Sequence, residues 1–161
     1  MMKPVISDLV VGINGSDASI LAAKYAIVLA KQQRCRLTAV YVVDTATIKQ
    51  LTLSKIFIQE ESQEYEHSLE ANGHRYLSYI GELARPKGVK IEREIRHGAV
   101  YTEILKVADE KQANLILLGG WERDRSTRDI MGNSYREIMI NAKCSVLLVK
   151  EPSVDHLYKL A

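Results

Sequence analysis

The chain has 161 residues, of which 47% are hydrophobic and 26% charged, a composition typical of one globular domain with a buried core. The formal net charge is +2 and no basic tract is present, so we expect no nucleic-acid partner. No apolar run approaches the roughly 20 residues of a membrane span. Residues 1–8 show no signal-peptide pattern, so we expect a cytoplasmic protein with no membrane partner.

The first part of the chain predicts two strands around a helix. Residues 6–13 (ISDLVVGI) are apolar and β-branched and end at Asn14-Gly15, which is typical of a strand followed by a turn. Residues 16–32 carry apolar side chains at spacings of three and four, which indicates an amphipathic helix capped by Ser16 or Asp17. Residues 36–43 (RLTAVYVV) are a second apolar run, too short for a comparable helix, and predict a second buried strand.

The middle of the chain leaves one segment open. Residues 48–58 are too apolar for a free loop, and they either cover the sheet edge or meet a partner subunit; the apolar members are Ile48, Leu51, Leu53, Ile56, Phe57 and Ile58. Residues 60–84 follow a helical period, although Gly73 and Gly81 each cost this helix about 1 kcal/mol relative to alanine. Pro86 and Gly88 end it.

The last part predicts three more strands. Residues 89–96 (VKIEREIR) alternate apolar and charged side chains, which favours a strand near the sheet edge, and residues 99–111 form the next helix. Residues 113–118 (ANLILL) are the most continuously apolar and predict a central strand. A polar loop over residues 119–131 leads to a helix over 132–141, the final strand 145–149 (SVLLV) and a short polar tail.

This alternation predicts an α/β fold: an open, doubly wound, five-stranded parallel sheet with helices on both faces, which is Rossmann-like. We expect one domain over residues 1–161, with its core at about 5–150 and a tail at 151–161.

In such a sheet, ligands bind at the carboxyl ends of the strands, where the strand order reverses. The candidate loops follow the first strand, at Asn14-Gly15-Ser16, and the fourth, at residues 119–134. Glycines allow close backbone approach, and the helix near Gly132 offers free N–H groups to an anion, although the same glycines are common in plain turns. The arginines of the second loop either pair with its acidic residues or hold phosphate oxygens; they are Arg123, Arg125 and Arg128.

No catalytic or metal-ligating pattern is apparent. The four histidines lack metal-ligand spacing, and no histidine neighbours Ser126 or Ser134 to activate a hydroxyl. Cys35 and Cys144 are far apart, which favours two buried thiols near strand starts in a reducing compartment.

Four segments, in order, resemble the universal stress protein family: DLVVGINGSDAS-ILAAKYAIVLAK, RLTAVYVVD, HGAVYTEILKVADEKQANLILLGG and GNSYREIMINAKCSVLLVK. The resemblance covers about residues 5–150. It implies an adenine nucleotide alpha hydrolase-like fold, a role in stress survival without a defined enzymatic reaction, and dimerisation through the last strand, Ser145–Val149. An apolar strand at a sheet edge favours the same pairing on physical grounds.

One branch of that family binds ATP through glycine, two residues, glycine, nine residues, glycine, then Ser or Thr. Gly119 and Gly132 match the first and third glycines, but Glu122 stands at the second and Asn133 at the Ser/Thr position, followed by Ser134. The family's aliphatic residue on the adenine side, after the second strand, matches Val42. Its acidic residue after the first strand is replaced by Asn14.

These departures have different consequences. Glu122 would repel a polyphosphate at a cost on the order of 1 kcal/mol in water-like surroundings. Asn133 can still hydrogen-bond an anion, whereas Asn14 lacks the charge that helps to hold magnesium.

Three functions follow. The leading hypothesis is a non-catalytic, dimeric stress-response or regulatory module with unknown protein partners. The alternative is an adenine-nucleotide sensor that binds ATP with magnesium and hydrolyses it slowly or not at all. A nucleotide-dependent ligase or an electron-transfer subunit rests on fold analogy alone.

Overall fold

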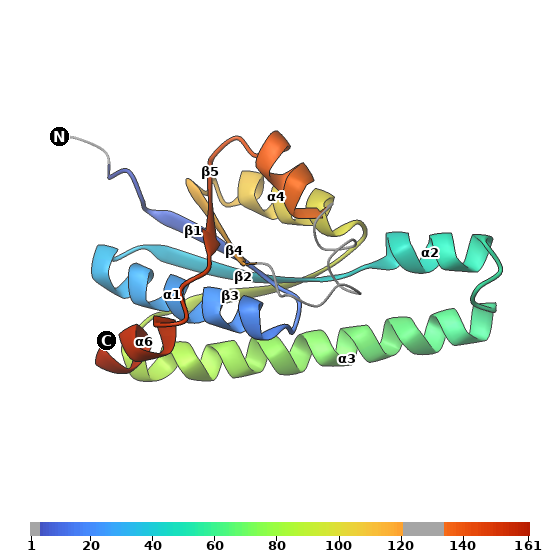
Figure 1. Cartoon of the computed structure of the whole chain (residues 1–161), viewed down its shortest axis with the longest axis horizontal. Helices are drawn as coiled ribbons and strands as arrows, with labels where there is room; N and C mark the ends of the chain where they lie inside the picture. Colours follow the sequence, from blue (N-terminus) through green and yellow to red (C-terminus); the bar gives the residue numbers. More distant parts are fainter. Residues whose placement is uncertain (1–3, 121–133) are drawn as a thin grey trace.

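Five parallel strands form one sheet in the computed structural model, which describes residues 4–120 and 134–161. Their spatial order is β3-β2-β1-β4-β5, and their bounds are β1 (Asp8–Ile13), β2 (Arg36–Val43), β3 (Ile91–His97), β4 (Leu115–Gly119) and β5 (Ser145–Val149). The predicted open parallel sheet is therefore confirmed, with β3 at an edge. The strand expected at the centre, β4, is an interior strand, but the central position belongs to β1 (Figure 1).

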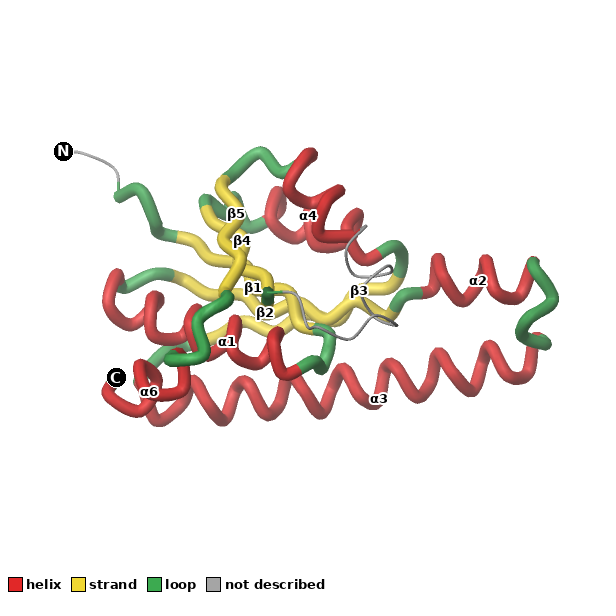
Figure 2. The backbone as a smooth tube through the Cα atoms, viewed as in Figure 1, coloured by secondary structure: helices red, strands yellow, loops and turns green. Residues whose placement is uncertain are grey.

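Helices cover both faces of the sheet (Figures 1 and 2). They are α1 (Asp17–Gln33), α2 (Thr45–Leu53), α3 (Gln59–Ala84), α4 (Val100–Glu110) and α6 (Val154–Leu160), with a short 3-10 turn η1 (Arg85–Lys87) and helical residues 134–141. Side chains alternate along β1, so Leu9 and Val11 pack in the core beneath α1 and α3, while Val10 packs in the core beneath α4. None of the described helices is both long and apolar enough to cross a membrane.

Capping explains where the helices begin and end. The hydroxyl of Ser16 accepts a hydrogen bond from the Ser19 backbone N–H at 3.1 Å, which starts α1 as expected. The carboxylate of Asp44 accepts from the Thr47 N–H at 3.0 Å and so starts α2. The chain leaves α3 through η1 and turns at Gly88, whose φ of 71° favours glycine.

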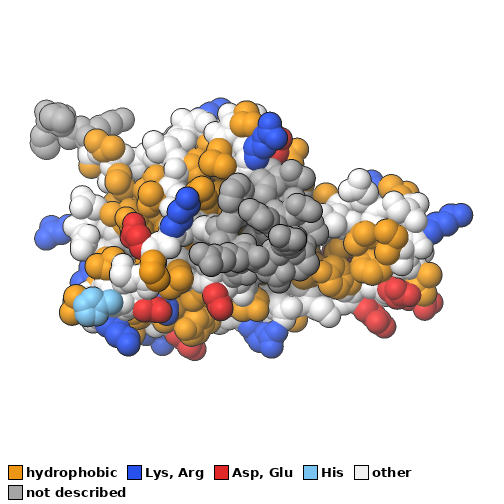
Figure 3. Space-filling view, in the orientation of Figure 1, with side chains coloured by type: hydrophobic (Ala, Val, Ile, Leu, Met, Phe, Trp, Pro, Cys, Tyr) orange, Lys and Arg blue, Asp and Glu red, His pale blue; other side chains and the backbone are white. Residues whose placement is uncertain are grey.

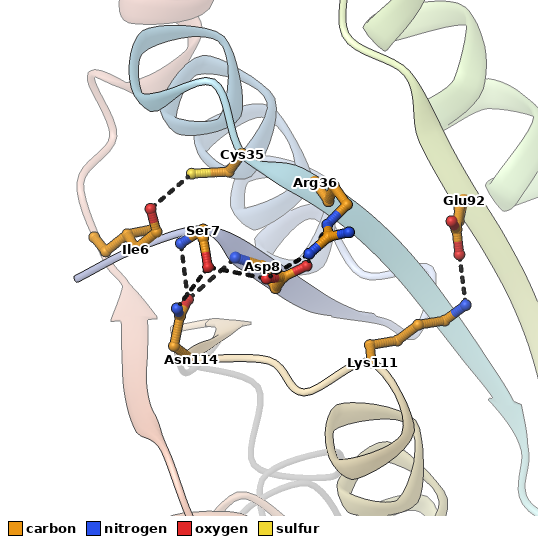
Figure 4. A network of polar contacts seen from close by, with 8 residues as sticks. All are labelled: Ile6, Ser7, Asp8, Cys35, Arg36, Glu92, Lys111 and Asn114. Atoms are coloured by element: carbon orange, nitrogen blue, oxygen red, sulfur yellow. Dashed lines mark hydrogen bonds and ion pairs between the residues drawn. The ribbon is translucent and has the colours of Figure 1, made fainter. Parts of the chain in front are cut away.

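A polar network joins the amino ends of three strands (Figure 4). The side-chain oxygen of Asn114 accepts from the backbone N–H groups of Ser7 and Asp8, at 3.0 and 3.2 Å. Arg36 donates to Asp8 at 2.6 Å, and the Cys35 thiol donates to the Ile6 carbonyl at 3.3 Å. The network lies at the amino ends of the strands, so it secures their register without reaching their carboxyl ends. Both thiols precede strands as predicted, but each is half-buried rather than buried.

The unassigned residues 48–58 form most of α2 and its connection to α3. Together with the first half of α3 they make an arm, residues 45–72, that extends beyond the sheet (Figures 1 and 2). Ile48 is buried, but the side chains of Leu53, Ile56 and Ile58 are 74%, 65% and 58% exposed. Hydrophobic side chains are visible over this arm in Figure 3. The alternative that the segment covers the sheet edge is wrong, because the arm extends beyond the sheet and three of the six apolar side chains are exposed.

The expected short polar tail at 151–161 contains a helix, α6, which the sequence analysis did not predict. Val154 is fully buried, and the Tyr158 hydroxyl donates to the Leu83 carbonyl of α3 at 2.6 Å. Lys24 of α1 pairs with Asp155 at 2.6 Å. One apolar anchor and two polar contacts therefore hold a mostly polar sequence against α1 and α3.

Candidate functional site

The candidate site lies at the carboxyl ends of β1 and β4. The chain runs from β1 outward through β2 to β3, and then returns to β4 on the other side of β1. The connections from β1 and β4 therefore diverge, which leaves a crevice at the carboxyl ends of the strands in doubly wound sheets. This is the position predicted from the loops after the first and fourth strands.

Hydrogen bonds between residues close in sequence stabilise the loop after β1. The side-chain oxygen of Asn14 accepts from the Ser16 backbone N–H at 2.9 Å, and the Asn14 N–H donates to the Ser19 hydroxyl at 3.4 Å. Gly15 has φ of 85°, and a Cβ there would lie 2.5 Å from the ring of Tyr76 on α3. Asn14 thus stabilises the turn into α1 and also lines the crevice. An amide oxygen can accept the Ser16 hydrogen bond as a carboxylate oxygen would.

A small cavity of about 50 Å³ occupies the crevice. It brings together three of the residues predicted from sequence, which are Asn14, Val42 and Ser134. The other lining residues come from β1, α4, β4 and the helix over 134–141: Gly12, Ile13, Val100, Ile104, Leu118 and Tyr135. Small-molecule pockets usually measure about 300–1,000 Å³. In this conformation the cavity has room for part of a ligand rather than for a whole nucleotide.

The remaining predicted residues do not line the cavity or lie outside the described part of the chain. Gly119 ends β4, and its backbone packs against α1 rather than facing the cavity. The described residues do not include Glu122, Gly132 and Asn133. The anion site expected at the start of the helix near Gly132 therefore also lies outside the described part of the chain.

Sequence reasoning missed the contribution of α4 and of Tyr135. A helix over residues 99–111 was predicted, but nothing in its sequence showed that the core beneath α4, which includes Ile104, reaches the carboxyl edge of the sheet. Tyr135 is 6% exposed and belongs both to that core and to the cavity wall. A large aromatic residue next to the glycine and serine positions of a predicted ligand loop is the signal that could have identified it.

The described lining of the cavity is mostly apolar, with one amide, one hydroxyl and one phenol among its side chains. Its described lining holds no Asp, Glu, His, Lys or Arg side chain. The acidic residue after β2, Asp44, accepts hydrogen bonds from the backbone N–H and hydroxyl of Thr47 at 3.0 and 2.7 Å, so its oxygens serve the start of α2. In the described ranges no three His, Cys, Asp or Glu side chains cluster to hold a metal ion. An apolar wall with Asn14 and Ser134 at its margin suits a planar ring with a polar edge.

The fold is that of an α/β protein with a small cavity at the carboxyl edge of a parallel sheet. The sequence model of the Universal stress protein family matches residues 6–150. Universal stress protein MJ0531 of Methanocaldococcus jannaschii is 34% identical over 148 residues, which cover 91% of this chain and 84% of that protein. Universal stress protein YxiE of Bacillus subtilis is 28% identical and is covered completely, over 91% of this chain. The chain belongs to the universal stress protein family.

Solved structures agree on the fold. A universal stress protein family member from Burkholderia pseudomallei superposes with a TM-score of 0.70 at 21% identity, covering 93% of this chain and all of that one. A universal stress protein in complex with cAMP gives 0.64 at 21% identity, covering 89% and 96% of the two chains. One from Archaeoglobus fulgidus in complex with dAMP gives 0.60 at 16% identity, covering 91% and 100%.

Proposed function

We propose that this protein is a non-catalytic stress-response module that works as a dimer. The observation that supports the first part is the lining of the candidate cavity, whose described side chains are uncharged and mostly apolar. General acid–base and nucleophilic catalysis need a titratable group within reach of the reacting atoms, together with a partner that activates it. Tyr135 and Ser134 are the candidates in the described lining, and no His, Asp, Glu or Lys side chain lines the cavity there to activate either of them.

The second part of the proposal is a dimer formed through β5. This strand is at the edge of the sheet, and Val146, Leu147 and Leu148 are each half-buried. Met139 and Ile140, in the helix just before it, are 44% and 65% exposed. Pairing β5 with its symmetry mate would cover an edge that otherwise offers an apolar template to other chains.

A second candidate function, an adenine-nucleotide sensor, is favoured by one specific observation. Asn14, Val42 and Ser134 were predicted from sequence as nucleotide-binding positions, and they share one cavity. The solved complexes with cAMP and dAMP show that proteins of this fold bind adenine nucleotides. A sensor of this kind would hold the base against Val42, with ATP and magnesium as its proposed physiological ligands.

Calorimetry with AMP, and with ATP plus magnesium, separates the two candidates. Val42→Asp places a carboxylate in the cavity wall, and Leu53→Asp adds the same charge on the exposed arm as a matched control. Binding by the native chain and by Leu53→Asp, but not by Val42→Asp, supports the sensor. Silence of the native chain with recovery in Glu122→Gly indicates a site disabled by that carboxylate. Silence in every variant leaves a protein-interaction module.

Two further measurements test the remaining parts. ADP release from ATP above the rate of a buffer blank would contradict the non-catalytic proposal. We also propose a cytoplasmic location, which is supported by Cys35 and Cys144 being free thiols, as expected in a reducing compartment. Localisation of a tagged chain by fractionation tests it.

A further inference from the structure

A second and larger depression lies on the outer side of the sheet, away from the candidate site. This groove, of about 440 Å³, is bounded by the last turns of α3 and by the chain that enters β3. Its polar lining consists of Ser78, Glu82, Arg85, Lys90 and Arg93. The volume falls within the range of small-molecule sites, which is about 300–1,000 Å³.

The cationic side chains of the groove have no counter-ion in the part of the chain that the structure describes. No carboxylate oxygen there lies within 4.0 Å of the charged nitrogens of Arg85, Lys90 or Arg93. The sole carboxylate in the lining is that of Glu82, which forms no such ion pair either. The groove therefore holds more positive than negative charge.

The other charged side chains of β3 provide a contrast. Glu92 pairs with Lys111 at 2.5 Å, Arg96 pairs with Glu94 at 2.7 Å, and His97 lies 3.4 Å from a Glu70 oxygen. Arg93 is thus the one charged residue of β3 without an ion-pair partner among the described residues. It faces the groove, where a ligand oxygen would take the place that carboxylates take elsewhere on the strand.

The position of Arg93 depends on a glycine inside α3. A Cβ at Gly81 would lie 3.0 Å from Nη1 of Arg93 and 3.5 Å from its Cζ. The missing side chain allows the guanidinium to lie across the helix, at the inner wall of the groove. The helix accepts a glycine in its interior, which is unfavourable for helix formation, and the groove gains space for the arginine side chain.

The end of α3 does not oppose an anion as strongly as a free helix end would. The carbonyl oxygens of Ala84 and Arg85 accept backbone hydrogen bonds from Val89 and Gly88, at 3.2 and 3.0 Å. These contacts partly neutralise the oxygens that would otherwise repel a phosphate.

We propose that this groove binds a small ligand that carries two or more phosphate groups. Arginine presents paired N–H donors that match phosphate oxygens, and a lysine adds a mobile point charge. Three cations against the one carboxylate of Glu82 leave an excess of two positive charges, and a groove of about 440 Å³ has room for more than a single phosphate group. The inference concerns a different part of the molecule from the proposed nucleotide site and does not depend on it.

Calorimetric titration with pyrophosphate and with tripolyphosphate at low salt tests the proposal. Neither probe carries a base for the apolar cavity, and binding at the loop over residues 119–134 would not respond to substitutions in the groove. We expect saturable binding by the native chain and a loss of at least tenfold in affinity for Lys90→Gln/Arg93→Gln. Lys143→Gln, which removes an exposed positive charge near Asp109 outside the groove, is the matched control and should bind as the native chain does.

A third variant separates binding from folding. Gly81→Ala should displace the Arg93 guanidinium and weaken tripolyphosphate binding, with an unchanged or higher melting temperature because alanine favours the helix. If the glutamine double variant fails to fold, Arg85→Gln takes its place. Two outcomes would overturn the proposal: no saturable binding of either polyphosphate by the native chain, or a loss of affinity in the Lys143→Gln control equal to that in the groove variants.

Discussion

The backbone of Gly119, at the end of β4, lies so close to that of Ala18 in α1 that a Cβ at Gly119 would be 2.4 Å from the Ala18 carbonyl carbon. The obstacle is main chain, which cannot rotate away as a side chain can. We therefore expect Gly119→Ala to lower the free energy of unfolding by about 3 kcal/mol or more, measured by urea denaturation.

Gly81→Ala is the matched control, because its new Cβ meets only the flexible end of Arg93. It should stay within about 1 kcal/mol of the native chain. Equal losses in the two variants would show that the contact between Gly119 and α1 has no special weight.

Gly73 in α3 faces the ring of Tyr41 on β2. A Cβ at Gly73 would lie 2.5 Å from Cδ1 of Tyr41, whose ring is buried and stacks on Tyr76 with centroids 6.3 Å apart. Gly73→Ala should therefore destabilise the protein by about 1–2 kcal/mol, since overpacking outweighs the gain in helix propensity. Chemical denaturation in the Tyr41→Leu background provides the check. There the same change should be neutral or stabilising, and an unchanged loss would mean that the ring is not the obstacle.

The proposed dimer makes opposite predictions for two edges of the molecule. Val146→Lys places a charge on β5 and should convert the dimer to a folded monomer in sedimentation velocity at micromolar concentration, because a buried lysine without a partner is costly. Leu53→Lys, on the arm, should leave the dimer intact. The reverse result, with Leu53→Lys monomeric and Val146→Lys dimeric, would move the interface to the arm.

Asp8 makes stability depend on acid pH. Burial tends to raise the pKa of Asp8, but hydrogen bonds from Arg36 and Ser7 outweigh it and hold the pKa below its ordinary value. A lowered folded-state pKa stabilises the protein above the unfolded pKa of about 3.9, and this contribution is lost as the pH falls through the folded value. Asp8→Asn should lower the melting temperature at pH 7 and reduce the loss of stability between pH 5 and 2.

Arg36→Gln provides the internal comparison for that prediction. It should reproduce much of the pH effect, and combining it with Asp8→Asn should add little, because the two side chains share one contact at 2.6 Å. Strictly additive changes would show that the pair is not the source of the acid dependence.

Much of the sheet could be predicted because its strands are short apolar runs between clear turn signals. Residues 36–43 and 145–149 were predicted with the bounds that β2 and β5 have, and Ser16 was among the expected caps. Sequence reasoning did not find α2 or α6. Both are short, and α6 depends on the burial of Val154 and on the hydrogen bond from Tyr158 to α3.

The candidate site was only partly predictable for a similar reason. Asn14 follows from the rule that ligands meet the carboxyl ends of parallel strands, whereas Val42 was implied by the family resemblance alone. The contribution of Val100 depends on how α4 packs across that edge, and no local pattern encodes this. Tyr135 could have been found from its place beside the predicted ligand loop. The glycines of α3 are a further case, since the sequence shows their cost and only the neighbours Tyr41 and Arg93 explain it.

The 26 residues of α3 divide into two parts with different support. Gly73, Leu77, Ile80 and Ala84 are buried against the body of the protein, whereas Ser62 is the one buried residue of the first half and faces Thr52 of α2. The amide hydrogens of the second half should therefore exchange with solvent only on global unfolding. Those of the arm should exchange through local opening of lower free energy, so a single continuous helix would melt in two stages, beginning at the end that carries the exposed apolar side chains.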